Sequence, residues 1–221
     1  VGLLGYYMYH GGSNPNGKLS TLQESRAIGY ANDLPEINYD FNAPIRQYGT
    51  ISDNYREIRL LAYFLQDFGA DLAVLPADID PDFVKPGDTH TLRVSVRHDD
   101  THGYVFVNNY QRRLTMDDHK DVVLKGKTKG EPVCFPKTDI ASGEYAFYPY
   151  NMKLKNAVLV SALATPLCKL SCKDEDVYVF YGDKDPQFTW DGTPAKVLHL
   201  SRADALSAAR VTLKDHQEYL V

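Results

Sequence analysis

Residues 91–97 read Thr91-Leu92-Arg93-Val94-Ser95-Val96-Arg97, a strict alternation of polar and apolar side chains. Successive side chains of a β-strand point to opposite faces, so this alternation predicts a strand with one face toward a core. Similar short segments follow downstream, at residues 104–108, 121–124, 144–148, 157–163, 177–181, 196–200, 211–213 and 218–221. Many short strands separated by turn residues predict an antiparallel β-sandwich over residues 88–221, in which residues 203–210 form either a short helix or a loop.

The first third of the chain has a different pattern. Val1–His10 is nearly all apolar or aromatic and ends at Gly11-Gly12, which is typical of a fully buried strand in a parallel sheet. A polar, turn-rich segment over residues 13–50 follows, with a short helical turn expected near residues 21–28.

An amphipathic helix comes next, with Ser52 or Asp53 as its cap and Gly69 at its end. Its apolar face is expected to consist of Tyr55, Ile58, Leu61, Leu65 and Phe68. The order of strand, long loop and helix predicts one βα unit over residues 1–75.

Residues 76–87 are proline-rich and acidic, which is typical of a linker. We therefore expect three parts: residues 1–75, the linker 76–87 and the all-β region 88–221. The chain starts without an initiator Met and stops at residues 217–221 in the middle of a strand pattern. The sequence thus suggests a longer natural chain, with the all-β region truncated at its C-terminal end.

Composition excludes several classes of function. The 221 residues carry a net charge of −5, with acidic and basic side chains interspersed, so a nucleic-acid partner is not expected. No apolar run reaches the ~20 residues of a membrane span. The three cysteines have no metal-site spacing, and residues 98–102, although rich in His and Asp, are better interpreted as a polar hairpin loop. We expect no metal and no cofactor.

Two motifs resemble those of family thirty-five glycoside hydrolases, the β-galactosidases built on a (β/α)8 TIM barrel. Residues 7–14, Tyr-Met-Tyr-His-Gly-Gly-Ser-Asn, are similar to the family's Tyr-Met-Phe-His-Gly-Gly-Thr-Asn at the eighth barrel strand. Residues 38–44, Asn-Tyr-Asp-Phe-Asn-Ala-Pro, are similar to its Ser-Tyr-Asp-Tyr-Asp-Ala-Pro. The match spans residues 3–68. It implies a mainly β fold preceded by the last βα unit of the barrel, namely strand 8, a long loop and helix 8.

The resemblance also implies a function, that of a retaining, exo-acting β-galactosidase that hydrolyses terminal non-reducing β-D-galactosyl residues. The family's two catalytic glutamates lie on its fourth and seventh strands, which would precede Val1, so we expect no catalytic residue in this chain. Phe41 aligns with a family tyrosine that contacts galactose and is, with Tyr39 and Tyr7, the expected substrate-binding wall. His10 is better interpreted as structural than as an orienter of a carboxylate.

A rival interpretation is a non-catalytic carbohydrate-binding or structural β-sandwich. It would be favoured if Tyr148, Tyr150 and Trp190 were exposed together on one flat face. The Asn14-Pro15 variant and residues 22–25 resemble a bacterial branch of the family. The sequence leaves open the galactoside preference, the oligomeric state and the compartment, whether periplasmic or extracellular or cytoplasmic.

Overall fold

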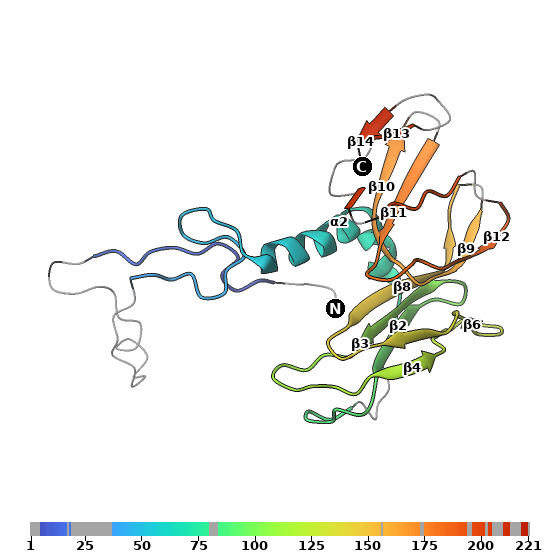
Figure 1. Ribbon diagram of the computed structural model, residues 1–221, viewed down its shortest axis with the longest axis horizontal. Coiled ribbons are helices and arrows are strands. Elements are labelled where there is room, and N and C mark those ends of the chain that lie inside the picture. Colours follow the sequence, from blue (N-terminus) through green and yellow to red (C-terminus); the bar gives the residue numbers. More distant parts are fainter. Residues whose placement is uncertain are drawn as a thin grey trace.

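The computed structural model describes residues 5–16, 18, 37–79, 84–155, 157–172, 175–193, 196–201, 203–204, 210–212 and 218–220. Its fold is mainly β, with antiparallel sheets and one long helix, α2 (Asp53–Val74), as Figure 1 shows. This confirms the predicted all-β character of the larger part of the chain, with an arrangement consistent with a sandwich. The helical turn expected near residues 21–28 lies outside the described residues, as does most of the segment 203–210.

A six-stranded antiparallel sheet forms the centre, with the strand order β1-β2-β3-β8-β9-β12. Its strands are β1 (Ala77–Asp78), β2 (Arg93–His98), β3 (Gly103–Asn108), β8 (Tyr145–Lys153), β9 (Val158–Ala162) and β12 (Phe188–Asp191). Four two-stranded ribbons accompany it: β4 (His119–Val122) with β7 (Thr138–Ile140), β5 (Lys125–Gly126) with β6 (Val133–Cys134), β10 (Thr165–Cys172) with β11 (Glu175–Tyr181), and β13 (Arg210–Thr212) with β14 (Glu218–Leu220).

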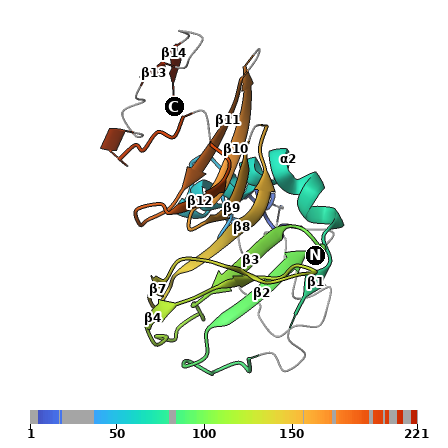
Figure 2. The ribbon, with the colours of Figure 1, turned by 90° about the vertical axis from the view of Figure 1, so that its right-hand side faces the viewer.

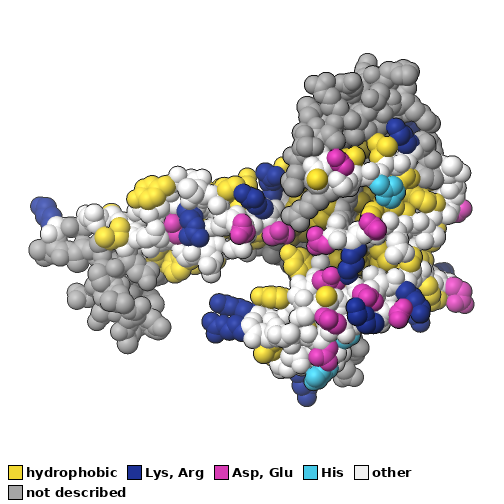
Figure 3. Space-filling view, in the orientation of Figure 1, with side chains coloured by type: hydrophobic (Ala, Val, Ile, Leu, Met, Phe, Trp, Pro, Cys, Tyr) yellow, Lys and Arg dark blue, Asp and Glu magenta, His cyan; other side chains and the backbone are white. Residues whose placement is uncertain are grey.

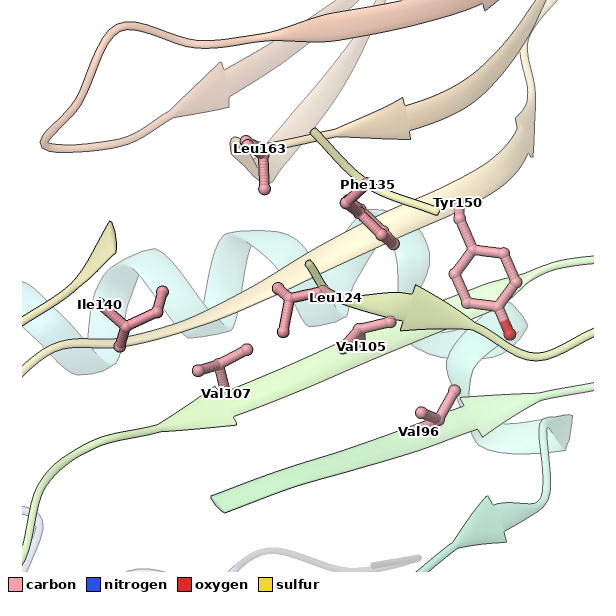
Figure 4. Close-up of a cluster of buried hydrophobic side chains, with 8 residues drawn as sticks. All are labelled: Val96, Val105, Val107, Leu124, Phe135, Ile140, Tyr150 and Leu163. Carbon is pink, nitrogen blue, oxygen red and sulfur yellow. The ribbon is translucent and has the colours of Figure 1, made fainter. Parts of the chain in front are cut away.

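Both faces of the central sheet carry a hydrophobic core. One core lies against the ribbons β4–β7 and β5–β6 and is drawn in Figure 4; its buried members are Val96, Val105, Val107, Leu124, Phe135, Ile140, Tyr150 and Leu163. The other lies against α2 and the ribbon β10–β11; its buried members are Phe64, Phe68, Leu75, Tyr104, Met152, Leu159 and Ala162. Figure 2 shows the helix and the β10–β11 ribbon above the lower strands of the sheet.

Strand β8 contributes to both cores because the alternation of its side chains between the two faces of the sheet is interrupted midway. Tyr150 belongs to the first core and Met152, two residues on, to the second. Two residues apart on a regular strand would share a face. Asn151 between them has φ 49, in the left-handed region that Asn tolerates better than most residues, and this turn of the backbone redirects the side chains that follow.

Most of the predicted strands form, although their ends shift by a few residues. Residues 196–200 are an exception, because they have no strand structure and are exposed. Strands β5, β6, β7, β10 and β12 were not predicted from the sequence, nor was β1, which lies in the expected linker. Strand β10 contains Pro166 and Lys169 within an irregular pattern, and β12 is only four residues long, so neither shows a clear alternation.

The helix continues past Gly69 to Val74, so the prediction that Gly69 ends it was wrong. Its buried residues are Phe64 and Phe68, whereas Leu65, predicted on the apolar face, is exposed. The physical reason is that Leu72 and Leu75 add apolar contacts to the second core, and this extra burial outweighs the modest helix penalty of one glycine. Ser52 is the cap residue, but its side chain makes no capping hydrogen bond.

The buried strand expected over residues 1–10 does not form in its described part. Residues 5–10 are irregular with a turn, and Tyr6, Tyr7 and Tyr9 are exposed. A buried parallel strand needs neighbours on both sides, whereas in the described residues this segment has a single parallel bridge, between His10 and Ile45. The barrel assignment of residues 1–75 stays a prediction, as does the division at residues 76–87, where Ala77 and Asp78 pair with β2.

Candidate functional site

The two segments that carry the family-like motifs lie side by side. We call residues 5–16 and 37–51 together the arm; residues 37–51 lie beyond the first turn of α2, away from the sheet, as Figure 1 shows. The Gly11 N–H donates to the Ile45 carbonyl at 2.7 Å, and the Ile45 N–H donates to the Tyr9 carbonyl at 3.1 Å. The Tyr39 N–H likewise donates to the Gly12 carbonyl at 2.9 Å. Residues about 30 positions apart in the sequence are thus held in register.

Asp40 organises this junction. Its side chain is buried, and its Oδ1 accepts a hydrogen bond from the Gln47 N–H at 2.6 Å while Oδ2 accepts one from the Asn38 side chain at 3.2 Å. A Cβ atom at Gly11 would lie 1.9 Å from Asp40 Oδ1, far inside van der Waals contact. Glycine is therefore required at position 11 to let the buried carboxylate approach the backbone.

The three predicted substrate-binding residues come together in the arm. Tyr39 meets the ring of Phe41 edge-on, with centroids 4.6 Å apart, and the ring of Tyr7 lies 6.5 Å from that of Phe41. Phe41 is 54% exposed and Tyr7 is 80% exposed, whereas Tyr39 is partly buried. We call these three residues the aromatic wall. Yellow side chains along the arm in Figure 3 show how much apolar surface it presents.

An open groove of about 400 Å³ runs along this wall. It is lined by Tyr6, Tyr7, Met8, Phe41, Asn42, Ala43, Pro44, Asn54, Glu57 and Ile58. Tyr39 does not line the groove but packs edge-on against Phe41. The sequence analysis missed Asn54 and Glu57, because these polar residues of α2 face the groove only through the way the arm folds back onto the helix. The Asn54 side chain donates to the Asn42 carbonyl at 3.3 Å and fixes that approach.

The backbone of the groove is strained at two bulky residues. Met8 has φ 58 and Phe41 has φ 47, both in the left-handed region. This conformation costs a non-glycine residue roughly 1–2 kcal/mol, because Cβ crowds the backbone. Strain of this kind persists where the surrounding structure imposes it, and it concentrates at ligand-binding sites. Among the described residues, Arg113, Asp121 and Asn151 in the sandwich also have positive φ, but Met8 and Phe41 line one groove together, which favours this groove as the candidate site.

The His-rich segment 98–102 forms the hairpin loop between β2 and β3, as predicted. Asp99 Oδ1 accepts hydrogen bonds from the backbone N–H groups of Thr101 and His102, at 2.6 and 2.9 Å. Partial burial raises the pKa of Asp99, but these bonds outweigh it and hold the pKa well below its usual range. Among the described residues there is no group of three side chains suited to holding a metal ion.

This loop also joins the sandwich to the last turn of α2. His102 Nε2 lies 2.9 Å from Asp71 Oδ1, and the Tyr104 hydroxyl donates to Asp71 Oδ2 at 3.0 Å. Burial, together with the charge of Asp71, raises the pKa of Tyr104, so this phenol stays protonated and keeps donating. The helix is therefore held to the sandwich by polar contacts as well as by the second core.

The aromatic residues of the rival interpretation do not form a platform. Tyr148 and Tyr150 pack in or against the first core, and Trp190 packs against the second core on the opposite face of the sheet. Tyr150 is fully buried, and its hydroxyl donates to the Lys127 carbonyl at 2.6 Å. No helix in the described part of the chain has the length and apolar character needed to cross a membrane.

No protein-family model matches this chain, and no curated protein is detectably similar to it.

Proposed function

We propose that this chain is part of a retaining, exo-acting β-galactosidase that hydrolyses terminal non-reducing β-D-galactosyl residues. The observation that carries the proposal is the meeting of Tyr7, Tyr39 and Phe41, three residues of the family-like motifs, in one aromatic wall in which Tyr7 and Phe41 are exposed. On this proposal residues 1–75 are the end of a TIM-barrel domain. The chain contributes one side of the sugar site and no catalytic carboxylate.

On this proposal the chain helps to bind and position the galactosyl group of the substrate. Hydrolysis with retention needs two carboxyl groups about 5–5.5 Å apart, one as nucleophile and one as acid/base, and both would come from residues before Val1. The exposed rings of Phe41 and Tyr7 offer apolar faces for the C–H side of galactose. Phe41 has no hydroxyl, so a water molecule or another donor must meet the sugar hydroxyl that a tyrosine would reach.

The sandwich has a supporting role in this proposal. The arm contacts the first two turns of α2, whereas the later turns of the helix carry Phe64 and Phe68 into the second core. A helix fixed at one end to a large core gives the groove at its other end a defined position. Binding sites perform best when a rigid element of this kind supports them.

A chromogenic β-galactoside tests the proposal directly. The purified 221-residue chain should show no turnover above background, because it lacks both glutamates. The longer protein that supplies those two strands should hydrolyse the β-galactoside and act far more slowly on the matching β-glucoside. Turnover that copurifies with the 221-residue chain would contradict the assignment of the glutamates, and a longer protein without β-galactosidase activity would contradict the function.

A further inference from the structure

Among the described residues that line the groove, Glu57 is the one carboxylate. It lies in the second turn of α2, while the aromatic wall belongs to the arm. The other polar side chains of the lining are two asparagines and two tyrosines, and the rest is apolar. A mostly apolar pocket with a few polar groups is the usual form of a small-molecule site, in which the polar groups fix the orientation of the ligand.

One contact from the sandwich reaches Glu57. The hydroxyl of Tyr145, the first residue of β8, donates to Glu57 Oε2 at 3.4 Å. Burial raises the pKa of Tyr145, and the negative charge of Glu57 raises it further, so the phenol stays protonated at neutral pH and can donate. The nearby Tyr181 behaves alike, because burial and then Glu57 raise its pKa to about 12.

The carboxylate of Glu57 keeps capacity for a ligand. Within the described part of the chain no Lys or Arg forms an ion pair with it. The contact from Tyr145 engages only one oxygen, and a carboxylate has about four lone-pair positions in all. Glu57 can therefore accept hydrogen bonds from a molecule in the groove without breaking a pair that the fold needs.

The groove thus combines two kinds of surface that a pyranose requires. A pyranose has an apolar C–H face and a rim of hydroxyl groups. Phe41 and Tyr7 offer ring surface to the first, and Glu57 offers a charged acceptor to the second. We propose that Glu57 accepts hydrogen bonds from hydroxyl groups of the sugar bound against the aromatic wall. This inference rests on the proposed function and adds a polar, specificity-determining contact from α2.

Titration of the 221-residue chain with D-galactose, followed by NMR, tests the inference. Glu57→Gln keeps the size of the side chain and removes its charge. Hydrogen bonds to a charged acceptor are roughly twice as strong as neutral ones, so the variant should bind D-galactose about fivefold more weakly. Glu131→Gln, in the exposed turn between β5 and β6, makes the same charge change away from the groove and should leave the affinity unchanged.

The outcomes separate this inference from the proposed function. If the unsubstituted chain binds D-galactose and Phe41→Ala weakens that binding while Glu57→Gln does not, Glu57 has no role and the proposed function stands. Equal losses in Glu57→Gln and Glu131→Gln would reveal a general charge effect and also overturn the role of Glu57. A chain that shows no response to D-galactose overturns the role of Glu57, whereas the proposed function is decided by the activity of the longer protein. The thermal unfolding midpoint of each variant must match that of the unsubstituted chain. We expect this because all three substituted side chains are exposed.

Discussion

The arm and the sandwich use the same kinds of side chain in opposite ways. In the sandwich Tyr150 is fully buried, and its hydroxyl is bonded to a carbonyl. In the arm Tyr7 is 80% exposed, and Phe41 is held in a left-handed conformation. The buried Tyr150 stabilises the fold, whereas Tyr7 and Phe41 expose apolar surface and Phe41 also has a strained backbone. Features that lower stability and still form a defined groove are best explained by binding.

The largest effect is expected in the second core. Phe64→Ala should lower the free energy of unfolding by about 3–5 kcal/mol, because it leaves a cavity where Phe64 meets Phe68, Tyr104 and Phe147. Urea unfolding followed by circular dichroism measures this. Leu65→Ala, on the next and exposed position of α2, is the matched control and should cost less than about 1 kcal/mol. Similar losses in both variants would mean that α2 does not pack as described.

Substitutions at two glycines, one in the sandwich and one in the arm, should have different effects on stability and on binding. A Cβ atom at Gly126 would lie 2.6 Å from the buried ring of Tyr150, so Gly126→Ala should destabilise the sandwich by about 1–3 kcal/mol. Gly11→Ala should instead displace Asp40 in the arm, abolish the response to D-galactose and leave the main urea transition within about 0.5 kcal/mol of the original. If Gly11→Ala unfolds the sandwich as well, the two regions are not separate in stability.

Phe41→Asn tests whether the strain serves binding. Asn tolerates the left-handed region better than Phe, so the variant should relieve about 1 kcal/mol of strain while removing the ring. Amide hydrogen exchange at Ile45 and Gln47 should slow by about fivefold, and the response to D-galactose should disappear. Faster exchange together with lost binding would show that Phe41 is a packing residue whose ring holds the arm together.

The smallest effect concerns Asp99 in the β2–β3 loop. Its pKa in the folded chain lies below the usual value of 3.8, so its contribution to stability is complete above that value and is lost as the pH falls toward the folded pKa. The free energy of unfolding of the original chain should therefore exceed that of Asp99→Asn at pH 7, and this difference should shrink from about pH 4 downward. A constant difference across this range would mean that the loop does not stabilise the charged form of Asp99.

The sandwich was largely predictable because its strands carry local signals. The alternation at residues 91–97 gave β2, although Val94 remains partly exposed. Strands β10 and β12 lack that signal, and their pairing depends on neighbours that are distant in the sequence. The end of α2 was missed for a similar reason, since the burial of Leu75 can be known only when the sheet is in place.

The candidate site was predictable in part. The motifs predicted that Tyr7, Tyr39 and Phe41 share one site. In the structure the Phe41 ring contacts both others, with centroid distances of 6.5 Å to Tyr7 and 4.6 Å to Tyr39. The strain at Met8 and Phe41 and the approach of Glu57 have no sequence signal, because they depend on how the two segments of the arm fold against each other and against α2. The expected strand at residues 1–10 depended on neighbouring strands, and the described residues give it only one parallel bridge, between His10 and Ile45.

The most direct test of the central claim is the effect of Phe41→Ala on kcat/KM for a β-galactoside in the longer protein that the proposed function requires, which would supply the two glutamates. The loss should be about 1–3 kcal/mol, or roughly 5- to 150-fold, the usual scale for one good pocket contact. Phe41→Tyr should be tolerated, and Tyr48→Ala, which removes an aromatic ring that is 84% exposed and lies outside the groove, should change nothing. If kcat/KM is unchanged in a folded Phe41→Ala variant, the aromatic wall does not bind the sugar.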